Sequence, residues 1–382
     1  MIGVVGGGQL AQMLAKAGKE RRVDVVVQTS SMSDPAARFS KKFILFDSEN
    51  IEGTIELSKS CVSITFENEW VDVSQLRGLE KSGVKFIPNL ASLSHLVNKI
   101  SQRKLLANLS IPCSEWIDCS SLDINNLSIP RGWSFPVMAK ASKGGYDGKG
   151  TLVIRNIDDL QNLLKTYENS DWLLEKWVGY DKELSLVVSR DEQGIIRTFP
   201  LVQTVQFQQI CDWVLAPADV EHSVQMMAYN IAASLLNELN YVGVLAIEFF
   251  YGEKGLLVNE IAPRTHNSGH FTIDACNSSQ FDQQLCIAAG LDIPDPKLTS
   301  PGALMVNLLG LSEENTLKSL DTRLKNIKNL KGVKLHWYGK EEERPGRKMG
   351  HVTVLLNGID SNTRKEEALQ ALEKIRAIWP IN

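Results

Sequence analysis

The stretch VGVLAIEFFYGEKGLLVNEIAPRTHNSGH, residues 242–270, decides the fold. It contains two apolar runs, Val244 to Tyr251 and Leu256 to Ile261, which are separated by the short segment Gly252 to Gly255. Apolar runs on either side of a glycine turn predict a β-hairpin. We therefore expect two antiparallel strands here, followed directly by a polar segment.

Glu248 and Glu260 occupy the two arms of this hairpin, twelve positions apart, and pairing around residue 254 sets them opposite each other. Like charges in that arrangement destabilise a sheet unless a cation lies between them. Apolar neighbours on both arms indicate a partly buried face, which increases the need for a counter-ion. Two counter-ions remain open: a lysine or arginine, or Mg²⁺, which prefers oxygen ligands and nucleotide phosphates. We favour magnesium because of the residues that follow.

The segment after the second arm is polar. Asn259 and the run RTHNSGH, residues 264–270, supply a fixed cation, a titratable imidazole and several hydrogen-bond donors. Such groups beside a metal suit transfer to an anionic oxygen. A lone histidine is more often structural, but this cluster predicts an active-site loop that contains Arg264, His266 and Asn267.

Upstream of the hairpin, the chain alternates short apolar runs with helix-like segments. Helix-like segments such as Leu10 to Lys19 separate apolar runs at residues 2–5, 23–27, 43–45, 62–66 and 84–87. This alternation predicts a parallel βαβ sheet. A helix-like stretch near Leu93 to Leu109 then leads into a strand-rich region, so we place the first domain boundary near residue 95. The last part of the chain, from residue 298, predicts a small further domain with a helix and two strands.

Gly6, Gly7 and Gly8 follow the first predicted strand and precede a helix, in the pattern GxGxxA. The backbone amides of such a turn can receive a phosphate, and close packing is the alternative role for its glycines. A dinucleotide site usually carries Asp or Glu at the end of the second strand, but this strand ends in Gln28. The sequence therefore disfavours a nicotinamide cofactor and a dehydrogenase.

A second glycine-rich segment, KGGYDGKG at Lys143 to Gly150, lies between two predicted strands, residues 137–140 and 151–154. This context is a hairpin rather than a strand followed by a helix, which excludes a Walker loop. A hairpin of this kind can fold over a triphosphate, with Lys140 facing the same phosphates. The alternative is a mobile surface hairpin with solvated charges.

The composition limits the class of protein. The chain has 382 residues, of which 43% are hydrophobic and 23% charged, with a formal net charge of -4. No electrostatic footprint for nucleic acid is present, and no apolar run approaches the ~20 residues that span a bilayer. We expect a cytoplasmic enzyme that binds neither nucleic acid nor a membrane. A local phosphate site is possible at the basic turn in KEEERPGRK, residues 340–348, which read alone is equally well a solvated loop.

Together these motifs resemble the 5-(carboxyamino)imidazole ribonucleotide synthase family, ATP-grasp enzymes of purine biosynthesis. The resemblance covers nearly the whole chain and rests on GGGQL at residues 6–10, FEN at 66–68, GGYDGKG at 144–150, NEIAPRTHNSGH at 259–270 and RPGRKMGH at 344–351. It implies a mixed α/β and α+β chain with an ATP-grasp fold. The implied domains are a Rossmann-like parallel-sheet domain at 1–94, an ATP-grasp domain at 95–297 and a small C-terminal domain at 298–382.

The resemblance also implies a reaction. ATP phosphorylates bicarbonate to carboxyphosphate, and the exocyclic amine of 5-aminoimidazole ribonucleotide captures the carboxyl group. The family resemblance further implies a homodimer.

Family roles carry over to this sequence position by position. The residues implied to bind the ATP phosphates are Lys99, Lys140, Gly144, Gly145, Tyr146, Asp147, Gly148, Lys149 and Gly150. The resemblance also implies that Glu175, Lys176 and Val178 line the adenine pocket and that Glu183 binds the ribose. Asn259 completes the implied ATP site. The resemblance implies that Glu248 and Glu260 bind magnesium. It also implies that bicarbonate is bound by Arg264, His266 and Asn267. Ribonucleotide contacts are implied at Gln9, Leu10, Glu67, Tyr146, Asp147, Lys149, Lys340 and Arg347.

The chain departs from the family pattern at two places. GGGQLGRM reads GGGQLAQM here, with Ala11 and Gln12 in place of glycine and arginine, and Gln206 stands where relatives commonly have a histidine near ATP. These departures leave open a nucleotide-binding module without catalysis. A further alternative keeps the ATP-grasp machinery with another acceptor, as in a formate-dependent glycinamide ribonucleotide transformylase or a biotin carboxylase.

Overall fold

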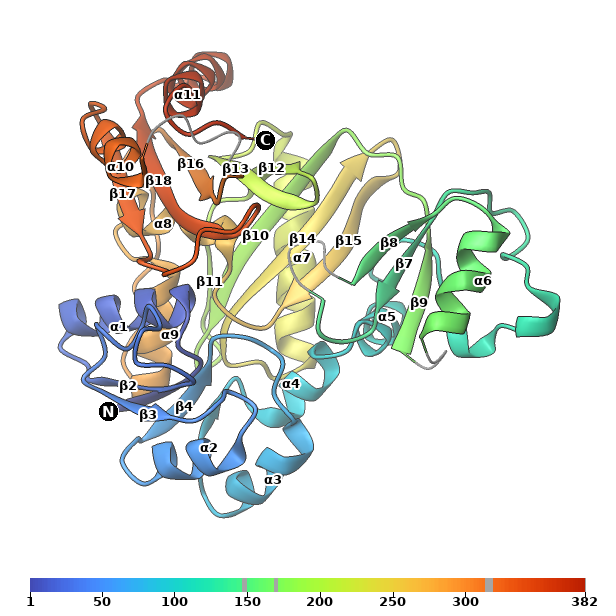
Figure 1. Ribbon diagram of the computed structural model, residues 1–382, viewed down its shortest axis with the longest axis horizontal. Helices are drawn as coiled ribbons and strands as arrows, with labels where there is room; N and C mark the ends of the chain where they lie inside the picture. The colour runs from blue at the N-terminus through green and yellow to red at the C-terminus, as the bar shows by residue number, and fades with distance from the viewer. Residues whose placement is uncertain (146–149, 168–170, 313–318, 382) are drawn as a thin grey trace.

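The computed structural model describes residues 1–145, 150–167, 171–312 and 319–381, and its strands form three sheets (Figure 1). In Figure 1 the N-terminal sheet lies at the lower left and the four-stranded sheet that carries α6 lies at the right. The largest sheet extends from β17 and β18 at the upper left to β14 and β15 near the four-stranded sheet. Within the described ranges, no helix is both long enough and apolar enough to cross a membrane.

The N-terminal sheet is parallel throughout, in the order β3-β2-β1-β4-β5, as the sequence predicts. Its elements are β1 Ile2–Val5, α1 Gln9–Arg21, β2 Val25–Thr29, β3 Lys42–Leu45, α2 Ile51–Ser58, β4 Ser63–Phe66, α3 Val73–Lys81, β5 Phe86–Ile87 and α4 Leu90–Leu96. The strand order reverses direction between β1 and β4, and ligands bind outside the carboxyl ends of strands at such a point. One face of the sheet packs against α1 and against α9, Gln280–Ala289, which comes from much later in the chain (Figure 1).

The four-stranded antiparallel sheet has the order β6-β9-β7-β8. Its elements are β6 Trp116–Asp118, the 3-10 turns Cys119–Ser121 and Ile124–Asn126, β7 Val137–Ala141, β8 Thr151–Ile154, α6 Ile157–Thr166 and β9 Trp172–Lys176. β7 and β8 pair antiparallel, from Val137 with Ile154 to Lys140 with Thr151. The two strands predicted around the glycine-rich segment are therefore confirmed.

The largest sheet follows the order β15-β14-β10-β12-β13-β16-β18-β17, and β11 pairs with β10. Its strands are β10 Lys182–Arg190, β11 Ile196–Thr198, β12 Val202–Phe207, β13 Ile210–Ala216, β14 Gly243–Gly252, β15 Gly255–Ala262, β16 Gly302–Leu309, β17 Val333–Trp337 and β18 Lys348–Leu356. The remaining helices are α5 Lys99–Asn108, α7 His222–Glu238, α8 Thr272–Ala275, α10 Leu320–Lys328 and α11 Ser361–Arg376. Apolar side chains of α7 pack on β10, β14 and β15 to form the main core behind the hairpin.

Two features differ from simple expectation. The stretch Leu93 to Leu109 is two helices, because the side chain of Asn98 accepts a hydrogen bond from the backbone N–H of Ser101 and caps α5. The C-terminal strands β16, β17 and β18 extend the largest sheet, since β16 pairs with β13. The C-terminal region therefore reaches the same sheet that carries the hairpin.

A buried ion network joins the four-stranded sheet to the largest sheet. Glu175 on β9, 3% exposed, accepts a hydrogen bond of 2.7 Å from Nε of Arg103 and lies 2.8 Å from Nζ of Lys140. Arg103 and Lys140 also donate to Asn259 on β15, to its backbone and side-chain oxygens. Burial alone raises the pKa of Glu175, but the two cations outweigh it and hold that pKa at about 2. The carboxylate therefore stays charged.

We predict that Glu175→Gln lowers the free energy of unfolding by roughly 3–5 kcal/mol, because it leaves two buried cations without their counter-charge. Urea denaturation followed by tryptophan fluorescence measures this loss. Since the pKa of Glu175 is depressed from 4.5 to about 2, its stabilisation is present above pH 4.5 and is lost as the pH falls toward 2. Glu56→Gln, in the exposed pair with Lys59, is the control and should change little. An equal response of the two variants would contradict the prediction.

Candidate active site

Glu248 and Glu260 face each other as predicted, because they pair directly in the β14–β15 ladder. The hairpin turn alone does not give this register. Nearer the turn Phe249 pairs with Val258, and an unbroken ladder from that pair would place Asn259 opposite Glu248. A β-bulge at this point adds Asn259 as an extra residue. Bulges redirect side chains beside functional sites, and this one brings the two carboxylates together.

The two carboxylates have different electrostatic surroundings. Burial, with repulsion from Glu260 and Glu183, raises the pKa of Glu248 to about 7. Burial also acts to raise the pKa of Glu260, but Lys99, whose Nζ lies 2.5 Å from Oε1, outweighs it and holds that pKa at about 2. The lysine alternative is thus realised for Glu260. Glu248 instead meets the imidazole of His266, with Nε2 3.6 Å from Oε1.

The carboxylate pair fits a magnesium ion that is shared with a nucleotide. The side chains of Glu248 and Glu260 are 27% and 35% exposed, so a ligand can reach them. Burial and the neighbouring carboxylates raise the pKa of Glu248 more than Lys348 and Lys140 lower it. Across the residues that the structure describes, no three His, Cys, Asp or Glu side chains gather into a metal site. A cation here would complete its shell with phosphate oxygens or water, as Mg²⁺ commonly does.

Polar contacts hold the loop after β15 in place. The side chain of Gln280 accepts from the backbone N–H of His266 at 2.8 Å and donates to its carbonyl oxygen at 2.7 Å. Nδ1 of His266 lies 2.8 Å from Oγ of Ser268, which leaves Nε2 directed at Glu248. The imidazole is therefore oriented toward the carboxylate pair, as an active-site loop requires.

Arg264 and Asn267 already have protein partners. Arg264 pairs with Glu69 through Nε and Nη2, with 3.2 Å between Nη2 and Oε1. The side-chain amides of Asn267 and Asn307 exchange two hydrogen bonds of 3.0 and 2.7 Å. The side chain of Arg264 is 17% exposed, whereas Asn267 is 8% exposed. Of these two predicted bicarbonate contacts, Arg264 is the more accessible.

Two of the predicted phosphate contacts, Lys99 and Lys140, bind adjacent residues of β15. Lys99 meets Glu260, and Nζ of Lys140 donates to Oδ1 of Asn259 at 2.9 Å. Gly144 and Gly145 follow β7, and the carbonyl of Gly150 accepts a 2.7 Å bond from Ala141, closing the base of the glycine-rich segment. Tyr146, Asp147, Gly148 and Lys149 lie outside the described residues.

The predicted adenine and ribose contacts are less closely grouped. The carboxylate of Glu175 serves the buried ion network, and Lys176 pairs with Glu115 at 2.8 Å. Val178 is half-buried. Glu183 accepts a 2.6 Å hydrogen bond from the hydroxyl of Tyr180, and its charge acts on Glu248. Glu183 therefore lies beside the carboxylate pair, whereas Lys176 turns toward Glu115.

The first glycine turn holds a carboxylate rather than offering free amides. Glu67, at the end of β4, accepts from the backbone N–H of Gly8 at 2.6 Å and of Leu10 at 3.0 Å. A side chain at Gly6 or Gly8 would collide with Glu67, since a Cβ there would lie 2.6 or 2.5 Å from its atoms. The amides of Gly8 and Leu10 are therefore occupied by Glu67 in this structure, and the close contacts at Gly6 and Gly8 favour the packing role of the glycines. Gln9, half-buried, and Leu10 flank the occupied turn at the switch point.

The basic turn near the C-terminus contributes a residue that the sequence interpretation missed. Lys340 donates to the carbonyl of Lys348 at 2.7 Å, and Arg347 donates to the carbonyl of Glu342 at 2.9 Å. Lys348 is 9% exposed, and its charge acts on Glu248. Its place at the start of β18, in the motif RPGRKMGH, was the available signal. Lys348 thus brings positive charge from the C-terminal region to the carboxylate pair.

The structure shows where the three residues that depart from the family pattern lie. Gln12 is 2% exposed, and its Nε2 donates to the carbonyls of Pro35 at 3.2 Å and Tyr338 at 3.0 Å. It thereby ties α1 to the C-terminal region. Ala11 is fully buried in the core of the N-terminal domain. Gln206 on β12 pairs with Cys211, next to a β-bulge at Asp212 on β13.

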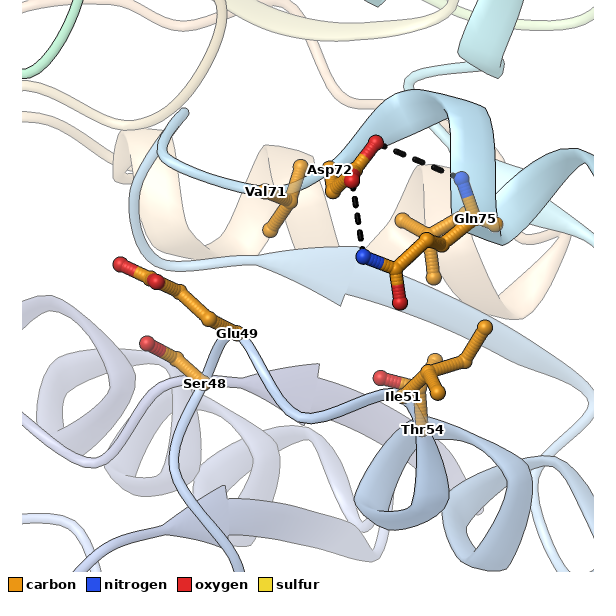
Figure 2. Close-up of a pocket in the computed structure, with 8 residues that line it drawn as sticks. Ser48, Glu49, Ile51, Thr54, Val71, Asp72 and Gln75 are labelled. Carbon is orange, nitrogen blue, oxygen red and sulfur yellow. Dashed lines mark hydrogen bonds between the residues drawn. The ribbon is translucent and has the colours of Figure 1, made fainter.

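Figure 2 shows a hollow between the loops that follow β3 and β4 in the N-terminal sheet. The residues that line it are Ser48, Glu49, Ile51, Thr54, Val71, Asp72, Gln75 and Leu76. Asp72 and Gln75 are joined there by a 2.8 Å side-chain hydrogen bond. No residue predicted for the site is among them, and Glu49 and Asp72 disfavour a phosphate. This hollow is separate from the carboxylate pair.

Similarity to known families covers the three parts of the chain. Residues 1–96 match the ribonucleotide synthetase preATP-grasp domain, residues 104–281 the ATP-grasp domain, and residues 303–365 the phosphoribosylaminoimidazole carboxylase C-terminal domain. The predicted fold class is confirmed by these matches.

Similar full-length proteins agree. N5-carboxyaminoimidazole ribonucleotide synthase of Synechococcus elongatus is 42% identical over 99% of this chain and 95% of its own. That of Synechocystis is 40% identical over 99% and 97%. A solved N5-carboxyaminoimidazole synthase of Aspergillus clavatus, in complex with ADP and 5-aminoimidazole ribonucleotide, superposes with a TM-score of 0.86 at 28% identity, over 98% of both chains. The chain belongs to the N5-carboxyaminoimidazole ribonucleotide synthase family.

Proposed function

We propose that the chain is an ATP-grasp carbon–nitrogen ligase that carboxylates 5-aminoimidazole ribonucleotide with ATP and bicarbonate, in purine biosynthesis. Family membership supports the overall reaction. Within the site, the observation that carries the proposal is the opposed pair Glu248 and Glu260, with Lys99 and Lys140 beside it. This arrangement suits a nucleotide triphosphate and its metal.

The nucleotide side of the reaction depends on charge balance. Glu248 and Glu260 would hold Mg²⁺, which when bound supplies positive charge to the triphosphate. Lys99 and Lys140 add fixed positive charge next to Asn259. Gly144, Gly145 and Gly150 bound the segment that would cover the phosphates and exclude water from a hydrolysable intermediate.

The acceptor side uses Arg264, His266 and Lys348 around the carboxylate pair. An oxygen of bicarbonate attacks the γ-phosphorus, and the bond from that phosphorus to ADP breaks. The exocyclic amine then attacks the carboxyl carbon of carboxyphosphate, the carbon–oxygen bond to phosphate breaks, and the amine loses a proton. Arg264 would hold the anion, since guanidinium binds planar oxyanions through paired N–H groups.

The ribonucleotide would bind between the N-terminal and C-terminal regions. Glu67 lies at the switch point of the N-terminal sheet, and the charge of Lys340 acts on it. We infer that Lys340 and Arg347 bind the phosphate and that Glu67, Gln9 and Leu10 lie near the imidazole. The proposal also includes three domains, at residues 1–94, 95–297 and 298–382. We further propose that the protein is a cytoplasmic homodimer, and sedimentation measures whether it is a dimer.

An assay of ADP release separates this function from its alternatives. We expect release to require both bicarbonate and 5-aminoimidazole ribonucleotide. Release that depends on formate and glycinamide ribonucleotide would favour the transformylase alternative. Binding of magnesium ATP in calorimetry without turnover under any of these conditions would favour a binding module.

Substitution of Glu248 tests the metal assignment. Glu248→Gln removes one of two repelling charges, so the melting temperature without ligand should stay constant or rise. The increase in melting temperature that saturating magnesium ATP gives the wild type should be largely lost, because that increase follows ligand affinity. Differential scanning fluorimetry measures both. Glu253→Gln, exposed in the turn of the same hairpin, should keep the full increase. A full increase in Glu248→Gln would contradict the assignment.

A further inference from the structure

The ion pair between Glu69 and Arg264 crosses from the N-terminal domain to the loop of the carboxylate pair. Glu69 lies between β4 and α3, two residues after Glu67, and Arg264 lies two residues after β15. The side chains of Glu69 and Arg264 are 14% and 17% exposed. A carboxylate and a guanidinium that meet through Nε and Nη2 form a two-point contact, which fixes the plane of the guanidinium.

The remaining donors of Arg264 are few and well defined. Of the five guanidinium N–H groups, Nε and one on Nη2 go to Glu69, and one on Nη1 goes to the carbonyl of Thr265 at 3.1 Å. Within the part of the chain that the structure describes, each terminal nitrogen keeps one further N–H. Two such donors match two oxygens of bicarbonate or of a carboxyl phosphate.

Other carboxylates compete for the same guanidinium. The charges of Glu260 and Glu67 both act on Arg264, although Glu69 is its direct partner. Without Glu69, Arg264 would be drawn toward Glu260, where it would compete with a metal ion. Glu69 therefore gives the guanidinium a hydrogen-bonded partner outside the carboxylate pair.

We propose that Glu69 is a positioning residue for the carboxylation. It fixes Arg264 so that its two remaining N–H groups meet the carboxyl group, and it keeps Arg264 off Glu260. It also joins the domain that carries Glu67 to the hairpin that carries the metal pair, so that amine and carboxyl group meet. This inference rests on the proposed function.

The test compares Glu69→Gln with Arg21→Gln. Arg21, on α1 of the N-terminal domain, also forms an ion pair with a residue from later in the chain. Its Nε lies 2.7 Å from Oδ1 of Asp282 on α9, and the two side chains are 36% and 14% exposed. The first quantity measured is the KM for bicarbonate. The second is the coupled fraction, which is the amount of carboxylated product formed per ADP released. The carboxylated product is detected by ¹³C NMR with labelled bicarbonate. We expect Glu69→Gln to raise the bicarbonate KM and to lower the fraction of ADP release that yields carboxylated product. The product of these two factors should be about tenfold. Arg21→Gln should match the wild type in both quantities.

Two further variants distinguish positioning from folding. Glu69→Asp keeps the charge and should recover part of the coupling. In an Arg264→Lys background, Glu69→Gln should add little, because it acts through Arg264. Equal KM and coupling in wild type and Glu69→Gln, or full additivity with Arg264→Lys, would overturn the inference. A wild type without ribonucleotide-dependent turnover would instead overturn the proposed function.

Discussion

Two negative charges on adjacent strands organise this molecule. Glu248 and Glu260 are opposed in the β14–β15 ladder, where like charges destabilise a sheet. The surrounding residues compensate the two charges to different degrees. Lys99 forms an ion pair with Glu260, whereas burial leaves Glu248 with a pKa of about 7. We propose that a cation and its nucleotide offset the repulsion that remains between the two carboxylates. The buried network of Arg103, Lys140 and Glu175 lies directly beside it and shares Asn259 with it.

Local sequence patterns predict the strands well, because each depends on residues close together in the chain. The parallel N-terminal sheet, the glycine-rich hairpin strands and the β14–β15 hairpin are confirmed. The opposition of the carboxylates was predicted from near-symmetric pairing. It is the bulge at Asn259 that produces it, and turn geometry alone gives a register one residue away. The bulged residue Asn259 accepts hydrogen bonds from Arg103 and Lys140, which are distant in sequence and are contained in no local pattern.

The residues that the sequence interpretation misplaced or missed all depend on distant partners. The amides of the first glycine turn are filled by Glu67, 59 positions from Gly8. Arg264 is held by Glu69, 195 positions away, and Lys348 reaches Glu248 because β16 and β18 extend the largest sheet. These contacts arise from packing of three chain regions around one site. Family resemblance indicates which motifs belong to the site but not the partners that hold their side chains.

The most direct test of the central claim is a crystal structure of the complex with Mn²⁺ and a non-hydrolysable ATP analogue, read by anomalous scattering. Manganese is chosen because it takes the oxygen ligands that magnesium takes and gives a measurable anomalous signal. The account predicts an anomalous peak between Glu248 and Glu260, shared with phosphate oxygens. A peak elsewhere, or a lysine side chain between the two carboxylates with the nucleotide bound, would contradict it.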